Sequence, residues 1–167
     1  VWYLLNFLLA RLTTNPVAMQ VLNLVIGASA VALFFRRAPF SLVQRLLFCF
    51  GYFMLFEFTV ISRGYGLGLL LIFAFCTRFR ASQRLDLTGA TMLLLLANTT
   101  VYGMIVAAHV AVLVAIQALL VRRNGRPWLD PRWVASLAIV LLGVAVGFGH
   151  TWMQGRAMGP AHVEAYS

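Results

Sequence analysis

The chain contains no lysine, and only four of its 167 residues are acidic, so all thirteen basic residues are arginines. Charged residues make up 10% of the sequence, against about 25% in a typical soluble domain. Apolar residues make up 62%, and the mean hydropathy is +0.91. So few charged side chains cannot cover the water-facing surface of a globular protein of this size. We therefore predict an integral membrane protein.

The sequence also lacks the common motifs of metal-binding, nucleotide-binding and hydrolase sites. Cysteine is scarce, and the spacing of Cys49 and Cys76 fits neither a CxxC motif nor a metal-ligand set, so we expect two reduced, buried thiols. No GxGxxG motif, P-loop, HExxH or GxSxG sequence is present. His109, His150 and His162 lack the spacing of metal ligands, and we expect a hydrogen-bonded packing role for His109. The cysteines and histidines thus predict no metal site.

The arginines lie between apolar runs. A net charge of +9 would suit a protein that binds nucleic acid, but ten arginines form three clusters: 36, 37 and 45; 78, 80 and 84; and 122, 123, 126 and 132. Short cytoplasmic loops of membrane proteins collect arginine, so we expect all three clusters on the cytoplasmic side and no nucleic-acid partner. The arginine-rich, lysine-free composition is typical of a GC-rich bacterial genome, which favours the bacterial inner membrane.

Two long apolar segments separate these clusters. As single helices, residues 46–77 and 85–121 would be about 48 and 55 Å long, whereas the hydrocarbon core is about 30 Å thick. Each segment must therefore fold back as a short hairpin. Glycine and polar residues predict the turns at SRGYG, residues 62–66, and at NTTVYG, residues 98–103.

The expected fold class is all-α, a single polytopic transmembrane helical bundle over residues 1–167. It would contain about six membrane helices, including the two short hairpins, at residues 17–35, 46–61, 64–77, 85–97, 102–121 and 133–149. Residues 1–12 would form a partial or interfacial helix, and residues 150–167 an external loop. Pro16 suits a first helical position, and Trp152 suits an interfacial anchor. We expect the chain to be a fragment of a longer protein.

Glu57 and Arg63 are the only charges between Phe48 and Phe75. Charged residues at membrane depth are usually functional. Arg63 lies in the first turn, where its guanidinium suits a phosphate or carboxylate, and Tyr65 would add a hydroxyl donor. Alternatively, Arg63 binds lipid headgroups or pairs with Glu57. Glu57 itself would bind a divalent metal, act as a base or only neutralise Arg63.

The second turn begins with Asn98, Thr99 and Thr100. These residues form an N-x-T sequon, but in a tight turn at membrane depth we expect their side chains to bond free backbone groups. Tyr102 follows as a candidate binding residue or an interfacial anchor. We expect the glycines near both ends of the bundle to permit close helix packing; they are Gly64, Gly66, Gly68, Gly143, Gly147 and Gly149.

Three segments resemble bacterial multi-pass membrane proteins related to GT-C glycosyltransferases, the group that includes protein mannosyltransferases and the aminoarabinose transferase of lipid A. The first is WYLLNFLLARLT, followed by NP and a span ending in FFRR. The second is FEFTVISRGYGLGLLLIF, and the third is LLLLANTTVYGMIVA. Together they cover roughly residues 1–121.

This resemblance implies transfer of a sugar from a polyprenyl-phosphate carrier to an acceptor on the external face of the membrane. In the family an acidic residue of the first external loop acts as the base, often with a divalent cation. That loop would precede Val1, so the catalytic residue would lie upstream and this fragment alone would be inactive. Arg63 and Tyr65 match the family's motif at the turn, with Glu57 near it, and Arg63 would lie near the carrier phosphate, where a positioned cation stabilises a leaving group.

The substrate-binding candidates are therefore Arg63, Tyr65, Glu57, Asn98 and Tyr102, and the expected partners are membrane lipids and a lipid-linked sugar. Two other functions fit the same pattern. A transporter or flippase also builds its site from short, interrupted helices. In a non-catalytic membrane scaffold, Glu57 and Arg63 would have no chemical role and would only neutralise each other's charge.

Overall fold

All regular structure in the described part of the chain is α-helical. The computed structural model describes residues 1–52, 54, 64–82, 85–122 and 131–157. Within these ranges there are seven helices and no strand, which confirms the all-α class. The helices are α1 (Trp2–Leu12), α2 (Val17–Arg37), α3 (Leu42–Cys49), α4 (Tyr65–Ser82), α5 (Leu87–Ala97), α6 (Val101–Arg122) and α7 (Pro131–Ala157).

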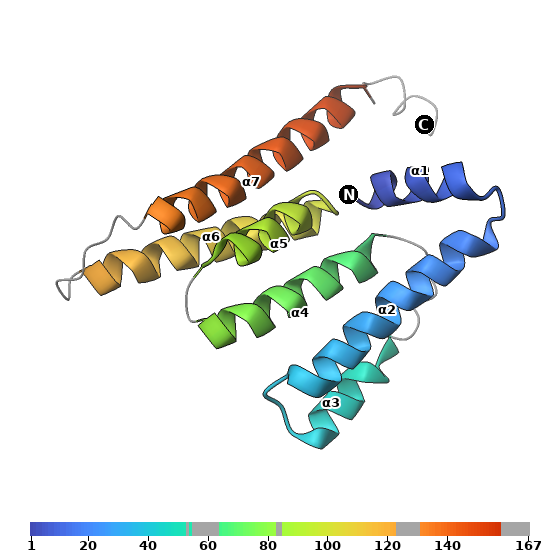
Figure 1. Cartoon of the computed structure of the whole chain (residues 1–167), viewed down its shortest axis with the longest axis horizontal. Helices are drawn as coiled ribbons and strands as arrows, with labels where there is room; N and C mark the ends of the chain where they lie inside the picture. The colour runs from blue at the N-terminus through green and yellow to red at the C-terminus, as the bar shows by residue number, and fades with distance from the viewer. Residues whose placement is uncertain (53, 55–63, 83–84, 123–130, 158–167) are drawn as a thin grey trace, which may run out of the picture.

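Helix α5 lies at the centre of the bundle. It packs against α4, α6 and α7, and its largest contact is with α7. On the other side of α4 lies α2, which also contacts α3 and α1 (Figure 1). Helices α5 and α6 form the second expected hairpin, because only residues 98–100 separate them.

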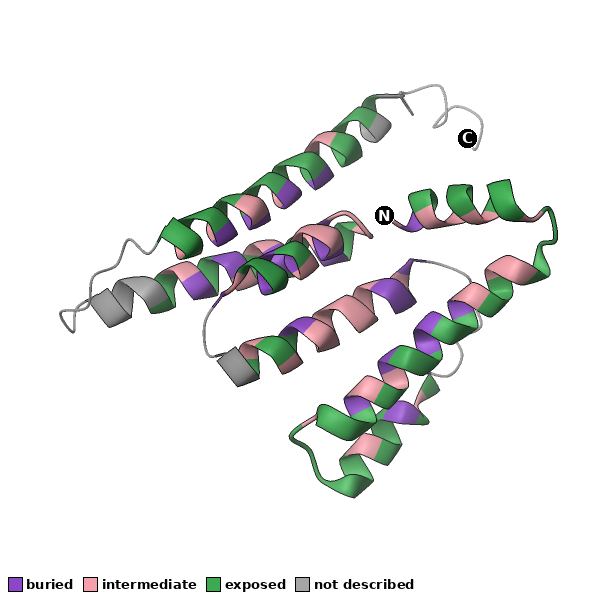
Figure 2. Ribbon diagram, viewed as in Figure 1, coloured by how far each residue is buried: buried purple, intermediate pink, exposed green. Residues whose placement is uncertain are grey.

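The core between α4, α5, α6 and α7 is made largely of small and branched apolar side chains. Its buried members include Ala90, Leu93, Ala107 and Val140. In Figure 2 the buried positions of α7 lie on the side that faces α5 and α6, and its exposed positions lie on the opposite side. Helix α7 therefore buries only one stripe.

The remaining surface is strongly apolar. Large exposed hydrophobic side chains occur on every described helix except α4, as with Leu47, Leu113 and Leu142. By length and composition, α2 and residues Pro131–Met153 of α7 can cross a membrane, and Trp2–Leu12, Leu87–Ala97 and Val101–Gln117 are shorter apolar helices. Among the described residues, two helices thus support membrane association, and about six membrane helices stays a prediction.

Helix α2 begins at Val17, as expected, but Pro16 is the N-cap and not the first helical residue. The side-chain oxygen of Asn15 accepts a hydrogen bond of 2.9 Å from the backbone nitrogen of Val17. This bond satisfies one of the helix's free donors, which is the usual task of a cap.

The expected helix over residues 46–61 differs from the structure. Helix α3 begins earlier, at Leu42, where Ser41 and Gln44 form a capping box. It ends at Cys49, because Phe50 leaves the helical conformation ahead of Gly51. Residues 55–61 of the expected helix lie outside the described residues.

The expected external loop over residues 150–167 is wrong for its first part, because α7 continues through Ala157. Contacts one turn apart support this extension: the ring of Trp152 stacks on Phe148 at 6.1 Å, and Arg156 lies over the Trp152 ring at 5.3 Å. Helix α4 also runs further than expected, to Ser82.

Both cysteines are free, as expected. Cys49 is buried, but Cys76 is exposed, so the expectation that both lie in the core is wrong for Cys76. Cys76 follows the buried Phe75 on α4 and therefore faces a different side of the helix.

The helix ends that adjoin the arginine clusters point away from the turn between α5 and α6. In Figure 1 the last residues of α4 and α6 and the first residues of α7 lie toward the left and the last residues of α2 toward the bottom, whereas the turn between α5 and α6 lies near the centre, beside the N-terminus. Arg45 also binds locally, since it donates to the backbone oxygens of Phe40 and Phe35 at 2.8 and 3.0 Å.

Candidate functional site

The start of α4 and the turn between α5 and α6 meet at one recess. Its volume is about 510 Å³, and its lining comes from three parts of the chain that are distant in sequence: Trp2, Tyr3, Gly64, Tyr65, Thr99, Thr100, Val101 and Tyr102. We call it the tip recess. Gly64 and Tyr65 of the first expected turn therefore lie next to the second expected turn.

Tyr65 and Tyr102 both line the recess. Tyr65 is the first residue of α4, and Tyr102 lies in the first turn of α6. Their ring centroids are 6.3 Å apart, in a tilted arrangement, and Tyr102 is 69% exposed. Each tyrosine combines an apolar ring with a hydroxyl group that can donate or accept a hydrogen bond. The pair can therefore hold a ligand that has both apolar and hydroxyl surfaces.

Helix α1 forms the third wall. Trp2 is buried, and it packs so closely against Gly64 that a Cβ at that glycine would lie 3.2 Å from the Cβ of Trp2. The nitrogen of Val1 donates a hydrogen bond of 2.8 Å to the backbone oxygen of Asn98. Helix α1 is thus bound to both expected turns.

The polar residues of the second turn bond the backbone, as expected. The Thr99 hydroxyl donates to the Leu96 oxygen at 2.7 Å. The Thr100 hydroxyl accepts from the nitrogen of Gly103 at 3.0 Å, which caps the start of α6. Gly103 is required here, since any Cβ would collide with the backbone oxygen of Leu96.

Asn98, a substrate-binding candidate in the sequence, links helices instead. Its side-chain nitrogen donates to the Leu94 oxygen on α5 at 2.9 Å and to the Gly143 oxygen on α7 at 3.1 Å. It is not among the residues that line the tip recess. The amide therefore stabilises the α5–α7 contact.

We expect Asn98→Ala to lower the free energy of unfolding by about 1–2 kcal/mol, because two hydrogen bonds to backbone oxygens are lost. Unfolding of the purified protein in mixed micelles, followed by circular dichroism, measures this change. Gln20→Ala is the control, since Gln20 is exposed on α2. An Asn98→Ala variant as stable as the control would contradict the assigned role.

Arg63 and Glu57 lie outside the described residues, so their predicted roles stay predictions. Of the other candidates, the structure brings Tyr65 and Tyr102 together and turns Asn98 away. The resemblance implies a divalent cation. The described residues contain no group of three or more His, Cys, Asp or Glu side chains that could bind a metal ion, so they do not fit such a cation.

His109 on α6 is hydrogen-bonded, as expected, but it is exposed, so the expectation that it packs inside the bundle is wrong. His109 Nδ1 lies 2.7 Å from the backbone oxygen of Ile105, one turn earlier. This distance fits a hydrogen bond from a protonated Nδ1 to the carbonyl. The residue is exposed on the helix.

An ion pair that the sequence analysis did not consider joins α4 to α5. Both Nε and Nη2 of Arg78 donate to Oδ2 of Asp86, at 2.8 and 2.5 Å. The other oxygen, Oδ1, accepts from the Gly89 nitrogen at 2.9 Å and caps α5. The hydrogen bond from Arg78 lowers the pKa of Asp86. Partial burial acts in the opposite direction and raises the pKa, and the hydrogen bond from Gly89 lowers it further. The sequence signal was an isolated aspartate directly before an apolar helical run.

No protein-family model matches the chain, and comparisons with curated proteins and with solved structures also find no match.

Proposed function

We propose that this chain is part of a polytopic bacterial inner-membrane protein that binds a lipid-linked sugar in the tip recess. In this proposal the arginine clusters face the cytoplasm and the tip recess faces the external side. The complete protein would transfer the sugar from its polyprenyl-phosphate carrier, as the resemblance to GT-C glycosyltransferases implies.

The observation that carries the proposal is the tip recess itself. It brings Tyr65 of α4 and Tyr102 of α6 to a ring separation of 6.3 Å, beside Trp2 and Tyr3. Its volume of about 510 Å³ falls within the range of about 300–1,000 Å³ that is usual for small-molecule sites. A sugar ring presents apolar C–H faces and hydroxyl edges, and aromatic side chains with hydroxyl groups complement both.

The position of the recess in the bundle is consistent with a lipid-linked ligand that enters the recess from the bilayer. The helix ends that adjoin the arginine clusters point toward the left and bottom of Figure 1, away from the recess. The positive-inside rule then assigns the recess to the external side. Exposed apolar side chains on the neighbouring helices, such as Val101 and Ile105, would let the polyprenyl chain stay in lipid while its headgroup enters the recess.

We expect Tyr65→Ala and Tyr102→Ala each to weaken binding of a polyprenyl-phosphate mannose by about tenfold, since each removes an aromatic contact and a hydroxyl group worth about 1–2 kcal/mol together. Calorimetric titration of the protein in detergent micelles measures the affinity.

Tyr52→Ala is the matched control, because Tyr52 is similarly exposed, at 66%, and does not line the recess. Binding of the carrier with wild-type affinity by both recess variants would refute the proposal. Absence of saturable binding to the wild-type protein would refute it as well.

A further inference from the structure

A second, separate depression runs between α6 and α7. It consists of two adjoining hollows, of about 400 and 570 Å³, that share Met104 and Phe148 in their linings. We call them together the α6–α7 groove. No residue of this groove lines the tip recess.

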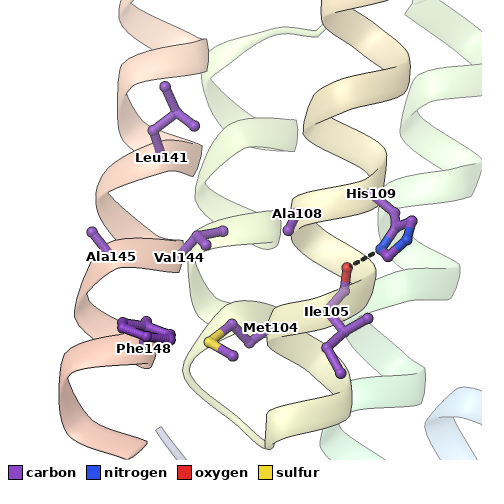
Figure 3. A pocket seen from close by; sticks show the side chains of 8 residues that line it. All are labelled: Met104, Ile105, Ala108, His109, Leu141, Val144, Ala145 and Phe148. Carbon is purple, nitrogen blue, oxygen red and sulfur yellow. Dashed lines mark hydrogen bonds between the residues drawn. The ribbon is translucent and has the colours of Figure 1, made fainter. Parts of the chain in front are cut away.

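The smaller hollow, of about 400 Å³, is apolar. In Figure 3 the side chains of Val144, Phe148 and Met104 occupy the space between the two helices. His109 is the one polar side chain of this hollow, but its ring lies on the far side of α6 and bonds the Ile105 oxygen (Figure 3). This part of the groove therefore offers a ligand only apolar contact.

The other end of the groove carries a positive charge. Arg156 lies over the ring of Trp152 at 5.3 Å, and both line the second hollow together with Thr151. The Thr151 hydroxyl donates to the Gly147 oxygen, and it retains acceptor capacity. Arginine beside an indole is a common arrangement at the boundary between membrane lipid and water.

The length of the groove fits one leaflet of a bilayer. From Leu141 to Trp152 is eleven residues of α7, or about 16 Å. Half of the hydrocarbon core is about 15 Å. Arg156 lies one further helical turn beyond Trp152, which is where the phosphate of a lipid headgroup would be.

We infer that the α6–α7 groove binds an anionic glycerophospholipid, with one acyl chain along the apolar part and the phosphate at Arg156. The charge of Arg156 complements the phosphate, and the apolar lining complements the chain. The inference depends on the membrane placement in the proposed function but not on sugar binding, because the two sites share no residue.

The test uses the full chain, recovered from the membrane fraction of the expressing cells and purified in detergent. Bound lipid is counted by native mass spectrometry during titration with dioleoyl phosphatidylglycerol or dioleoyl phosphatidylcholine. We expect one tightly bound phosphatidylglycerol and a preference of about fivefold over phosphatidylcholine, the effect of one arginine near a lipid phosphate.

Two variants and one control separate the two parts of the groove. Arg156→Ala should abolish the preference for phosphatidylglycerol, and Ala145→Trp should remove binding of both lipids by filling the apolar hollow. Arg11→Ala is the matched control, because Arg11 also lies over an aromatic ring, that of Phe7, at 5.1 Å, and it lines neither hollow.

Equal binding of the two lipids by the wild-type protein would overturn the inference, and so would an unchanged preference in Arg156→Ala. A dimer without bound lipid would show that a second copy covers the groove. Failure of the protein to reach the membrane fraction would refute the membrane placement, whereas loss of mannose-carrier binding with lipid binding intact would refute only the sugar-binding proposal.

Discussion

Replacing Gly143 by alanine is expected to lower the free energy of unfolding by about 1–3 kcal/mol, although alanine is the better helix former. The new Cβ would lie 2.7 Å from the Cα of Leu94, a backbone atom of α5. Backbone cannot move aside as the end of a flexible side chain can, so the two helices must separate. This separation would also lengthen the bond from Asn98 to the Gly143 oxygen.

Gly147→Ala should act in the same way, since its Cβ would lie 2.7 Å from the backbone oxygen of Ala97. The two glycines are one helical turn apart and face the same helix. Once one substitution has separated α5 from α7, the second meets less resistance. We therefore expect the double variant to lose less stability than the sum of the single losses.

Gly149→Ala is the matched control, because a Cβ there meets no atom within 4 Å. Its substitution should leave stability unchanged or raise it by up to about 1 kcal/mol. Unfolding in mixed micelles of increasing dodecyl sulfate content compares the three variants. A Gly143→Ala protein as stable as Gly149→Ala would show that α5 and α7 are not in close backbone contact.

Asp86→Ala is expected to cost about 1–2 kcal/mol, because one carboxylate both caps α5 and pairs with Arg78. Loss of an N-cap aspartate costs about 1 kcal/mol. The ion pair adds less, since the Arg78 side chain is 50% exposed and that of Asp86 31% exposed. Asp86→Asn keeps an oxygen that can accept from Gly89, so it should lose only the smaller part.

The ion pair also predicts the direction of a pH effect. The hydrogen bond from Arg78 holds the pKa of Asp86 in the folded protein below its ordinary value of about 3.9. Its contribution to stability is therefore complete above about pH 4 and is lost as the pH falls through the lower, folded-state pKa.

Thermal unfolding between about pH 2 and pH 6 measures this effect. The difference between wild type and Asp86→Asn should shrink toward the acid end, because both side chains are then uncharged. A difference that stays constant over this range would show that Asp86 does not titrate with the folding equilibrium.

Much of the helical pattern follows from the sequence alone. The start of α2 at Val17 agrees with the structure, and the turn predicted at residues 98–103 is present but shorter, at residues 98–100. Asn15, Pro16 and the NTT sequence act through local hydrogen bonds. Two helix boundaries predicted from the local sequence were wrong. The break at Phe50 divides a continuous apolar run, and α7 continues through polar residues as far as Ala157.

The sequence could not show which candidate residues share a site. Tyr65 and Tyr102 are 37 positions apart, and no periodicity links them, so their common recess depends on how α4 and α6 pack around α5. For the same reason the sequence predicted that the Asn98 side chain bonds backbone groups, but it could not show that one of them, the Gly143 oxygen on α7, lies 45 positions away.

The sequence by itself determined the class of molecule: its composition limits the chain to apolar helices with arginine-rich ends, because the hydrophobic run lengths and charges are local properties. Only the tertiary structure decided that the start of α4, the turn between α5 and α6, and α1 line one recess, that Gly143 and Gly147 meet α5, and that α6 and α7 leave a groove ending at Arg156. These features depend on contacts between distant parts of the chain, which side-chain shape and close packing select.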